Sequence, residues 1–326
     1  VSSSSGGSGG LSNLGGSGGL SNLGGSGGLS NLGGSSGSGS PNYSGQNLKK
    51  SDLKKANLKK ANFKQADLRG ATLKEADLKK ANLSGAKLEN TDLTKAKLKK
   101  SILKNANLKD AKLTRADLTD AELNYAVLNN ANLRNSKLRK ANLNDAKLKR
   151  ANLTNAKLKK ATLINASLKK AKLRRAVLTK ANLTNADLKR ANFSSANLEE
   201  ANLFRASLIS AKLGKANLKN AYLKNADLKR ANLSSANLNG ANLSNTNFFS
   251  ANLKRANLSN ADFTSSNLSN SDLSYANLRN AKLRNANLTN ANLYGISETK
   301  LASCPELLPN GWTCNSENYL KKIKSF

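Results

Sequence analysis

The chain of 326 residues carries 54 Lys and Arg against 20 Asp and Glu, a formal net charge of +34, with no His, no Met and two Cys. Without His and with two Cys, a His–Cys metal site cannot be built, and general acid–base chemistry loses its usual side chain. No run of about 18 apolar residues occurs, so no helix is expected to cross a membrane. The composition therefore predicts a protein that is not an enzyme and has no metal, no cofactor and no transmembrane segment.

The start of the chain gives an expectation about its origin. The sequence begins with Val1 and lacks Met, whereas translation begins with Met, so a segment is expected to have been removed from the front. Cleavage of a secretion signal is one common cause, and the alternative is that the sequence is a fragment. The first interpretation places the protein outside the cell or at the cell surface.

Residues 1–45 form the first predicted region, an N-terminal arm of Gly, Ser and Leu without a charged side chain. The motif GGSGGLSNL occurs there three times, at residues 6–14, 15–23 and 24–32. Gly/Ser composition is typical of a flexible tether. A tether does not require apolar pairs at a nine-residue period, and such pairs favour association. The alternative is an assembly segment whose contact residues are Leu11, Leu14, Leu20, Leu23, Leu29 and Leu32.

Residues 46–295 form the second region, fifty consecutive five-residue units without an insertion or a deletion. The third position is Leu in 46 units and Phe in four, and the first position is Ala in 42. The second position is mostly Asn or Asp, and the fourth and fifth are mostly Lys, Arg, Asn, Ser or Thr. Residues 41–45, PNYSG, have the pattern of a degenerate opening unit.

A period of five fits neither regular secondary structure. On an α-helix every fifth residue advances by about 140°, which would scatter the Leu side chains over all sides. On a flat strand an odd period moves each successive Leu to the opposite face. The chain is therefore expected to turn a corner in every unit and to form stacked coils that bury Leu and Ala.

These units resemble a known family. Segments such as Ala76-Asp77-Leu78-Lys79-Lys80 and Ala106-Asn107-Leu108 follow the pattern A-(N/D)-L-x-x of pentapeptide repeat proteins. The resemblance implies an all-β fold, a right-handed quadrilateral β-helix (solenoid) with four units per coil. It places the first and third positions inside and the other three outside. Fifty units would make about 12 coils, and ~4.8 Å between layers would make the rod about 60 Å long.

The resemblance also raises one functional alternative. Some pentapeptide repeat proteins mimic DNA and bind a topoisomerase through an acidic surface. The net charge of +34 has the opposite sign and argues against that role here.

Residues 296–326 leave the repeat and look like the C-terminal extension of some bacterial members of the family, which predicts a cap over the last coil. Solenoids need such ends because an open coil exposes unpaired backbone groups. The apolar residues expected to cover the coil are Leu307, Leu308, Trp312 and Ile323. A disulfide between Cys304 and Cys314 would staple the cap in an oxidising compartment, and two free thiols in a cytosolic protein are the alternative.

The basic residues are unevenly distributed over the four faces, where a face is the set of units that recur every 20 residues. Each face is named after its first third-position residue. At the fourth and fifth positions, Lys and Arg number 12 on the Leu48 face, 11 on the Leu53 face and 13 on the Leu58 face. The Phe63 face carries 5 and is rich in Ser, Asn and Thr, with Tyr125, Ile164 and Phe204 as large outward residues.

No catalytic constellation is apparent. Glu199-Glu200 is the only pair of adjacent acidic residues in the repeats, and on a convex surface it is expected to be solvated. The Gly-rich arm lacks the Lys of a phosphate-binding loop.

Two functions remain. The leading hypothesis is a non-enzymatic secreted structural protein that assembles with itself, head to tail, into an extracellular fibre bridged by the arm. The alternative is a basic surface module that binds polyanions, either acidic polysaccharide or nucleic acid, and is tethered by a flexible arm. No specific recognition of nucleic acid is expected, because there is neither a recognition helix nor an aromatic stacking platform.

Overall fold

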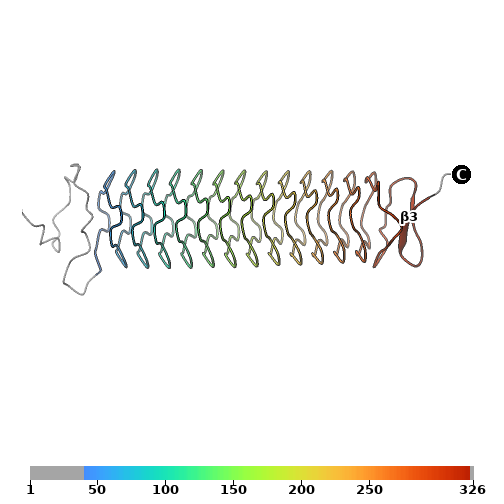
Figure 1. The fold of residues 1–326 in the computed structure, drawn as a ribbon, viewed down its shortest axis with the longest axis horizontal. Helices are drawn as coiled ribbons and strands as arrows, with labels where there is room; N and C mark the ends of the chain where they lie inside the picture. Colours follow the sequence, from blue (N-terminus) through green and yellow to red (C-terminus); the bar gives the residue numbers. More distant parts are fainter. Residues whose placement is uncertain (1–39, 324–326) are drawn as a thin grey trace, which may run out of the picture.

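A computed structural model describes residues 40–323, which form a long rod with a small β-sheet at its C-terminal end (Figure 1). Residues 40–323 contain no helix, and so none that is long and apolar enough to cross a membrane. Parallel bridges join residues 20 apart along the rod, from Asn42↔Asn62 to Asp272↔Asn292. Four five-residue units therefore complete one coil, and equivalent positions stack in the next coil.

Each unit bends the chain once, as residues 181–185 illustrate. The N–H of Ala186 donates to the carbonyl of Leu183 over 3.0 Å, which closes a turn around Thr184 and Asn185. Asn185 has a φ of 57°, whereas Thr184 does not have a positive φ. A positive φ at only the third residue of a hydrogen-bonded turn defines type II. The fifth position keeps this left-handed conformation along the rod, and Gly takes it at Gly45, Gly70, Gly85, Gly240 and Gly295.

Backbone hydrogen bonds join each coil to both neighbours. In the same unit, Leu183 N–H donates to Asn202 C=O over 2.6 Å and Asn185 N–H donates to Phe204 C=O over 2.9 Å, both in the following coil. The N–H of Asn182 donates to Ala161 C=O in the preceding coil over 2.9 Å. Together with the turn, four of the five amides of a unit are thus paired with backbone carbonyls.

The one remaining amide, that of the fourth position, donates to the side chain of the second position. Asn182 Oδ1 accepts from the N–H of Thr184 at 3.0 Å and from its hydroxyl at 2.6 Å. Asp and Asn play the same part in many other units, for example Asp117 for Thr119 and Asn252 for Lys254. A short side chain with a carbonyl oxygen reaches its own backbone two residues ahead, which explains why Asn and Asp dominate this position.

This role makes a stability prediction. Replacing Asn182 by Ala should lower the free energy of unfolding by about 1 kcal/mol, because the turn loses its acceptor. Lys157→Ala is the matched control, since Lys157 also occupies a second position but has no acceptor atom. Urea unfolding followed by circular dichroism measures both, and equal destabilisation by the two variants would contradict the assigned role.

The interior is a continuous column of Leu, Phe and Ala, with most side chains fully buried. Some first positions are Ser or Thr, and these too are buried. The Ser101 hydroxyl donates to Leu98 C=O over 2.7 Å, and the Thr91 hydroxyl donates to Leu68 C=O over 2.8 Å. A small hydroxyl side chain is therefore accepted at the first position because a carbonyl lies within its reach.

The N-terminal end of the rod begins one unit before the predicted boundary at residue 46. Pro41–Gly45 already forms a unit of the coil, in which Tyr43 takes the third position and stacks on Phe63 with ring centroids 4.8 Å apart.

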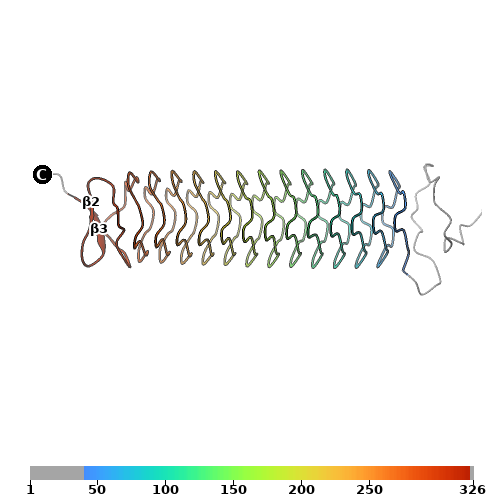
Figure 2. The ribbon, with the colours of Figure 1, turned by 180° about the vertical axis from the view of Figure 1, so that it is seen from behind.

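The C-terminal end is a three-stranded antiparallel sheet in the order β1-β3-β2 (Figure 2). Its strands are β1 (Thr299–Lys300), β2 (Trp312–Cys314) and β3 (Tyr319–Lys322). Lys300 pairs with Tyr319 and Cys314 with Leu320, so β3 lies between the other two strands.

Candidate functional surfaces

A strip of exposed cations runs along the Leu58 face. It is made by the fourth and fifth residues of stacked turns, which lie one coil apart, about 5 Å. This basic strip consists of Lys59, Lys60, Lys79, Lys80, Lys99, Lys100, Arg139, Lys140, Lys159 and Lys160, all exposed. Thr119 and Asp120 interrupt it once. The coil spacing gives the strip a length of roughly 24 Å.

Most of the strip has no anionic partner. Asp77 lies between Lys59 and Lys79, with 3.8 and 3.7 Å between the ammonium nitrogens and a carboxylate oxygen. The other eight cations of the strip make no ion pair with any residue between 40 and 323. Stacked like charges repel one another, so this surface favours a bound anion.

Some acidic side chains of the rod form ion pairs with neighbouring cations, namely Asp67, Glu75, Asp77, Asp110, Asp187 and Glu200. On the Leu48 face, the Arg69 guanidinium lies 2.6 Å from the Asp67 carboxylate, and this hydrogen bond lowers the pKa of Asp67 to about 2. Glu200 lies 3.1 Å from Lys180, and Glu199 accepts from the Asn217 amide at 3.4 Å. The Glu199-Glu200 pair thus belongs to the network of surface pairs.

The Phe63 face carries one cluster of large outward side chains, and a second pair of exposed aromatics, Tyr275 and Tyr294, lies on the Leu53 face. Phe204 stacks on Tyr222 with ring centroids 5.9 Å apart, and the Arg205 guanidinium lies 4.9 Å from the Phe204 ring. Tyr125 is exposed and Ile164 is half-buried, and neither belongs to this cluster.

The N-terminal edge of the rod is an open edge of the coil. In interior coils the second-position N–H donates to the preceding coil, but those of Asn42, Asn47, Asp52 and Asn57 have no acceptor among residues 40–323. The carbonyls of the second and fourth positions in residues 41–60 likewise receive no backbone hydrogen bond from the described residues. An unpaired edge of this kind is a template for another segment of chain.

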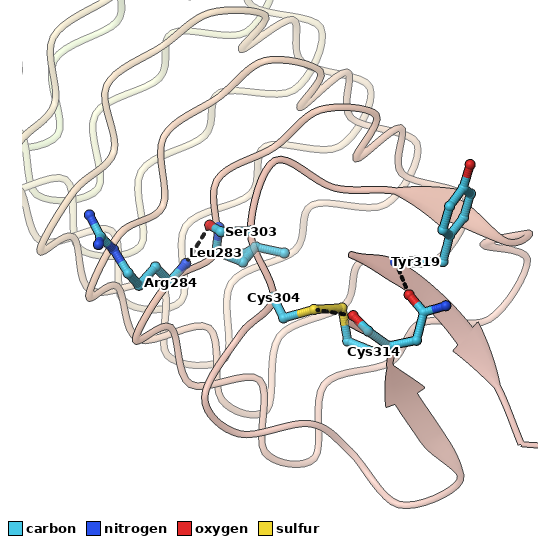
Figure 3. Close-up of a disulfide and its surroundings, with 7 residues drawn as sticks. Leu283, Arg284, Ser303, Cys304, Cys314 and Tyr319 are labelled. Carbon is cyan, nitrogen blue, oxygen red and sulfur yellow. Dashed lines mark hydrogen bonds between the residues drawn. A yellow bond between two sulfur atoms is a disulfide. The ribbon is translucent and has the colours of Figure 1, made fainter. Parts of the chain in front are cut away.

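The C-terminal end continues the coil before it turns into the sheet. Ser303 aligns with Lys282 and Leu307 with Asn287, so the chain passes once more over two faces of the last repeat. The Ser303 hydroxyl accepts from the N–H groups of Leu283 and Arg284, both over 3.0 Å (Figure 3). Leu301 and Leu320 are the two cap leucines that are almost completely buried.

A disulfide joins Cys304 to Cys314 and so ties this extra coil to β2 (Figure 3). Beside it, Asn315 Oδ1 accepts from the Tyr319 N–H over 2.7 Å, which fixes the turn between β2 and β3. The covalent link closes a short loop and holds the sheet on the end of the rod.

The cap differs from expectation at two of the four residues named for it. Leu308 and Trp312 are partly buried against the core. Leu307 is 47% exposed and Ile323 is 54% exposed, so neither covers the coil. Leu307 aligns with Asn287, a second-position residue whose side chain points outward, and Ile323 follows the end of β3. Leu301 and Leu320, which were not predicted, take their place because periodicity gives no signal outside the repeat.

The predicted assembly residues and the residue types that could bind a metal ion lie as follows. The assembly leucines Leu11, Leu14, Leu20, Leu23, Leu29 and Leu32 lie outside the described residues. Between residues 40 and 323, no group of three or more His, Cys, Asp or Glu is arranged to hold a metal ion.

Solved structures similar to the chain are pentapeptide repeat proteins of different roles. HetL, involved in heterocyst differentiation regulation in the cyanobacterium Nostoc sp. strain PCC 7120, is 35% identical, covers 64% of this chain and 89% of its own, and has a TM-score of 0.47. Rfr23 from the cyanobacterium Cyanothece 51142 is 23% identical over 41% of this chain and 91% of its own, with a TM-score of 0.25. QnrB1, a plasmid-mediated fluoroquinolone resistance protein, is 19% identical over 70% of this chain and 89% of its own, with a TM-score of 0.25. No curated protein matches the chain.

The family itself follows from the repeats. The family model described as "Pentapeptide repeats (8 copies)" matches residues 44–75, 76–115, 101–139, 116–155, 136–175, 171–208, 201–240, 226–264 and 261–297. These overlapping matches run through most of the chain and coincide with the stacked coils. The chain therefore belongs to the pentapeptide repeat family, whose members form right-handed quadrilateral β-helices.

Proposed function

We propose that the protein is a non-enzymatic structural rod of about 12 coils that is secreted and assembles head to tail into an extracellular fibre, with the N-terminal arm before residue 41 bridging neighbouring subunits. The observation that carries this proposal is the difference between the two ends of the rod. The N-terminal end presents a coil edge whose backbone groups have no partner within residues 40–323, whereas the C-terminal end presents a disulfide-linked sheet with Leu307 and Ile323 exposed. Contacts between unlike ends are heterologous, and they produce an open-ended assembly when the rotation does not close.

The charged sides support the same arrangement. Three of the four faces are basic, so two rods that lie side by side repel each other within about a Debye length, ~8 Å at physiological salt. The first full coil, residues 46–65, is itself basic, with seven Lys, but the arm before it has no charged side chain, so contacts made through the arm avoid this repulsion. Growth along the axis is thus favoured over lateral clustering.

Negative-stain electron microscopy of the full-length protein at physiological salt tests the proposal. We expect long, thin, unbranched filaments one rod wide. Isolated rods about 60 Å long, the length set by the coil spacing, would contradict it.

A second candidate function is carried by the basic strip of the Leu58 face. The ten cations of the strip form a linear array with two cations per coil, about 5 Å from coil to coil and interrupted once at Thr119 and Asp120, which suits a linear polyanion such as an acidic polysaccharide laid along the rod. Eight of these cations make no ion pair within residues 40–323. Such binding would follow charge density and would release counterions, so it would weaken steeply as salt is added.

A further inference from the structure

The N-terminal edge of the rod has a specific set of backbone groups that find no partner within residues 40–323. Within the rod, the second-position amides of the next coil find carbonyl acceptors: Asn62 N–H donates to Pro41 C=O over 2.8 Å, and Thr72 N–H donates to Ser51 C=O over 2.9 Å. The corresponding amides of Asn42 and Asp52 would need first-position carbonyls from a segment lying over residues 41–55. The edge therefore specifies what could cover it: a segment with the pattern of a repeat unit.

The arm contains that pattern in register. Ser21-Asn22-Leu23-Gly24-Gly25 lies 20 residues before Pro41–Gly45, the spacing of all stacked units in the rod. Each residue suits its position: Ser is accepted at buried first positions, Asn at the second, Leu at the third and Gly at the left-handed fifth. Gly at the fifth position carries no steric penalty, unlike the Lys found there in much of the rod.

A second copy of the motif reaches another face. Ser30-Asn31-Leu32-Gly33-Gly34 lies 21 residues before residues 51–55. The C-terminal end of the rod shows that the coil accepts this spacing, because Ser303 pairs with Lys282 at an offset of 21 and Leu307 with Asn287 at an offset of 20. In the arm, an offset of 20 places residues 21–25 over residues 41–45, and an offset of 21 places residues 30–34 over residues 51–55.

We propose that residues 21–34 add one incomplete coil to the open edge of their own chain, with Leu23 stacked on Tyr43 and Leu32 stacked on Leu53. Ser21 and Ser30 would supply the carbonyls that Asn42 and Asp52 need. The partner is the same chain because only residues 35–40 separate the second copy from Pro41, which gives it a high effective concentration at the edge. This cap does not depend on fibre formation, and it leaves residues 1–20, with Leu11, Leu14 and Leu20, as the part of the arm that bridges to a neighbouring subunit.

Residue-resolved amide hydrogen exchange of the full-length protein, in solution too dilute for assembly, tests the inference. The test variant carries both Leu23→Asp and Leu32→Asp, which place charges at interior positions of the proposed coil. The control variant carries both Leu11→Asp and Leu14→Asp, which make the same change in charge outside residues 21–34. In the wild-type and control proteins, Asn42 and Asp52 N–H should exchange at least about tenfold more slowly than in the Leu23/Leu32 variant, as expected for the gain of one or two backbone hydrogen bonds. The amides of Asn62 and Thr72 should stay protected in all three proteins, because their acceptors lie within the rod.

Two results would overturn the inference. One is an equal exchange rate of Asn42 and Asp52 in the two double variants. The other is protection that increases with protein concentration, which would assign the edge to the arm of a second molecule. The first readout comes from dilute protein and the second from a concentration series kept below the range in which filaments form, so both are independent of filament formation.

Discussion

Deletion of residues 1–40 should abolish filament formation and leave a folded, soluble rod. The described residues already contain a continuous core from Tyr43 to Leu320, so the truncated rod should fold, and loss of the proposed cap over Tyr43 and Leu53 should lower its thermal midpoint only modestly. The truncated protein would keep its basic sides and its C-terminal sheet but would lose the segment that we propose as the bridge. Analytical ultracentrifugation should then show one species of monomer mass where the full-length protein sediments as polymers.

A variant with three point changes separates loss of the bridge from loss of the whole arm. Leu11→Ser, Leu14→Ser and Leu20→Ser remove apolar contact area and leave residues 21–34 intact. This variant should assemble more weakly than the wild-type protein while its melting curve stays the same. Filaments of unchanged length from the truncated protein would refute the role of the arm.

Neutralising four cations of the basic strip should weaken polyanion binding about a hundredfold at physiological salt. The changes are Lys99→Gln, Lys100→Gln, Lys159→Gln and Lys160→Gln, all at exposed positions that make no ion pair within residues 40–323. Each lost contact removes about 0.7 from the slope of log K against log salt, so four should reduce that slope by about 3. Fluorescence anisotropy with labelled heparin, measured at several salt concentrations, provides both numbers.

The Phe63 face offers a control with the same change in net charge. Lys64→Gln, Lys104→Gln, Lys224→Gln and Arg284→Gln remove four cations that are distributed along the rod. Binding by this control should remain within a few-fold of wild type, because its charges are too far apart to act together. If the two quadruple variants lose the same affinity, net charge alone explains the binding, and the strip is not a site.

The interior of the rod was predictable because a single physical constraint repeats at every unit. Leu or Phe at the third position and Ala at the first are the residues that the narrow coil buries, and the five-residue period excludes helix and flat strand. The opening unit PNYSG could also be read as a degenerate repeat, and its Tyr43 does take the interior position.

The contacts of the second and fifth positions were not predicted. The preference for Asn and Asp at the second position was visible, but its cause, an acceptor for the N–H of the unit's fourth position, depends on backbone geometry that composition does not give. Likewise, Lys at many fifth positions gives no hint of a left-handed conformation, which the sequence signals only where Gly occurs.

The cap was the least predictable part, because it depends on side-chain register without a period. Leu307 and Leu308 are adjacent and equally apolar, yet the alignment of Leu307 with Asn287 turns it outward and leaves Leu308 toward the core. Leu320 is buried because it lies in β3, where it pairs with Cys314 of β2. Both strands lie beyond the repeat, so its period says nothing about them.

The stapled sheet at one end has a mechanical consequence for the rod. Among residues 40–323, the first coil makes inter-coil backbone hydrogen bonds only to the coil that follows it, whereas the chain beyond the last repeat is tied to the sheet by the Cys304–Cys314 bond. Tension on the chain would therefore unwind the rod from its N-terminal end, one coil at a time. Each coil of 20 residues would release roughly 70 Å of extended chain while the rod shortens by about 5 Å, so the protein could lengthen greatly under load and rewind when released.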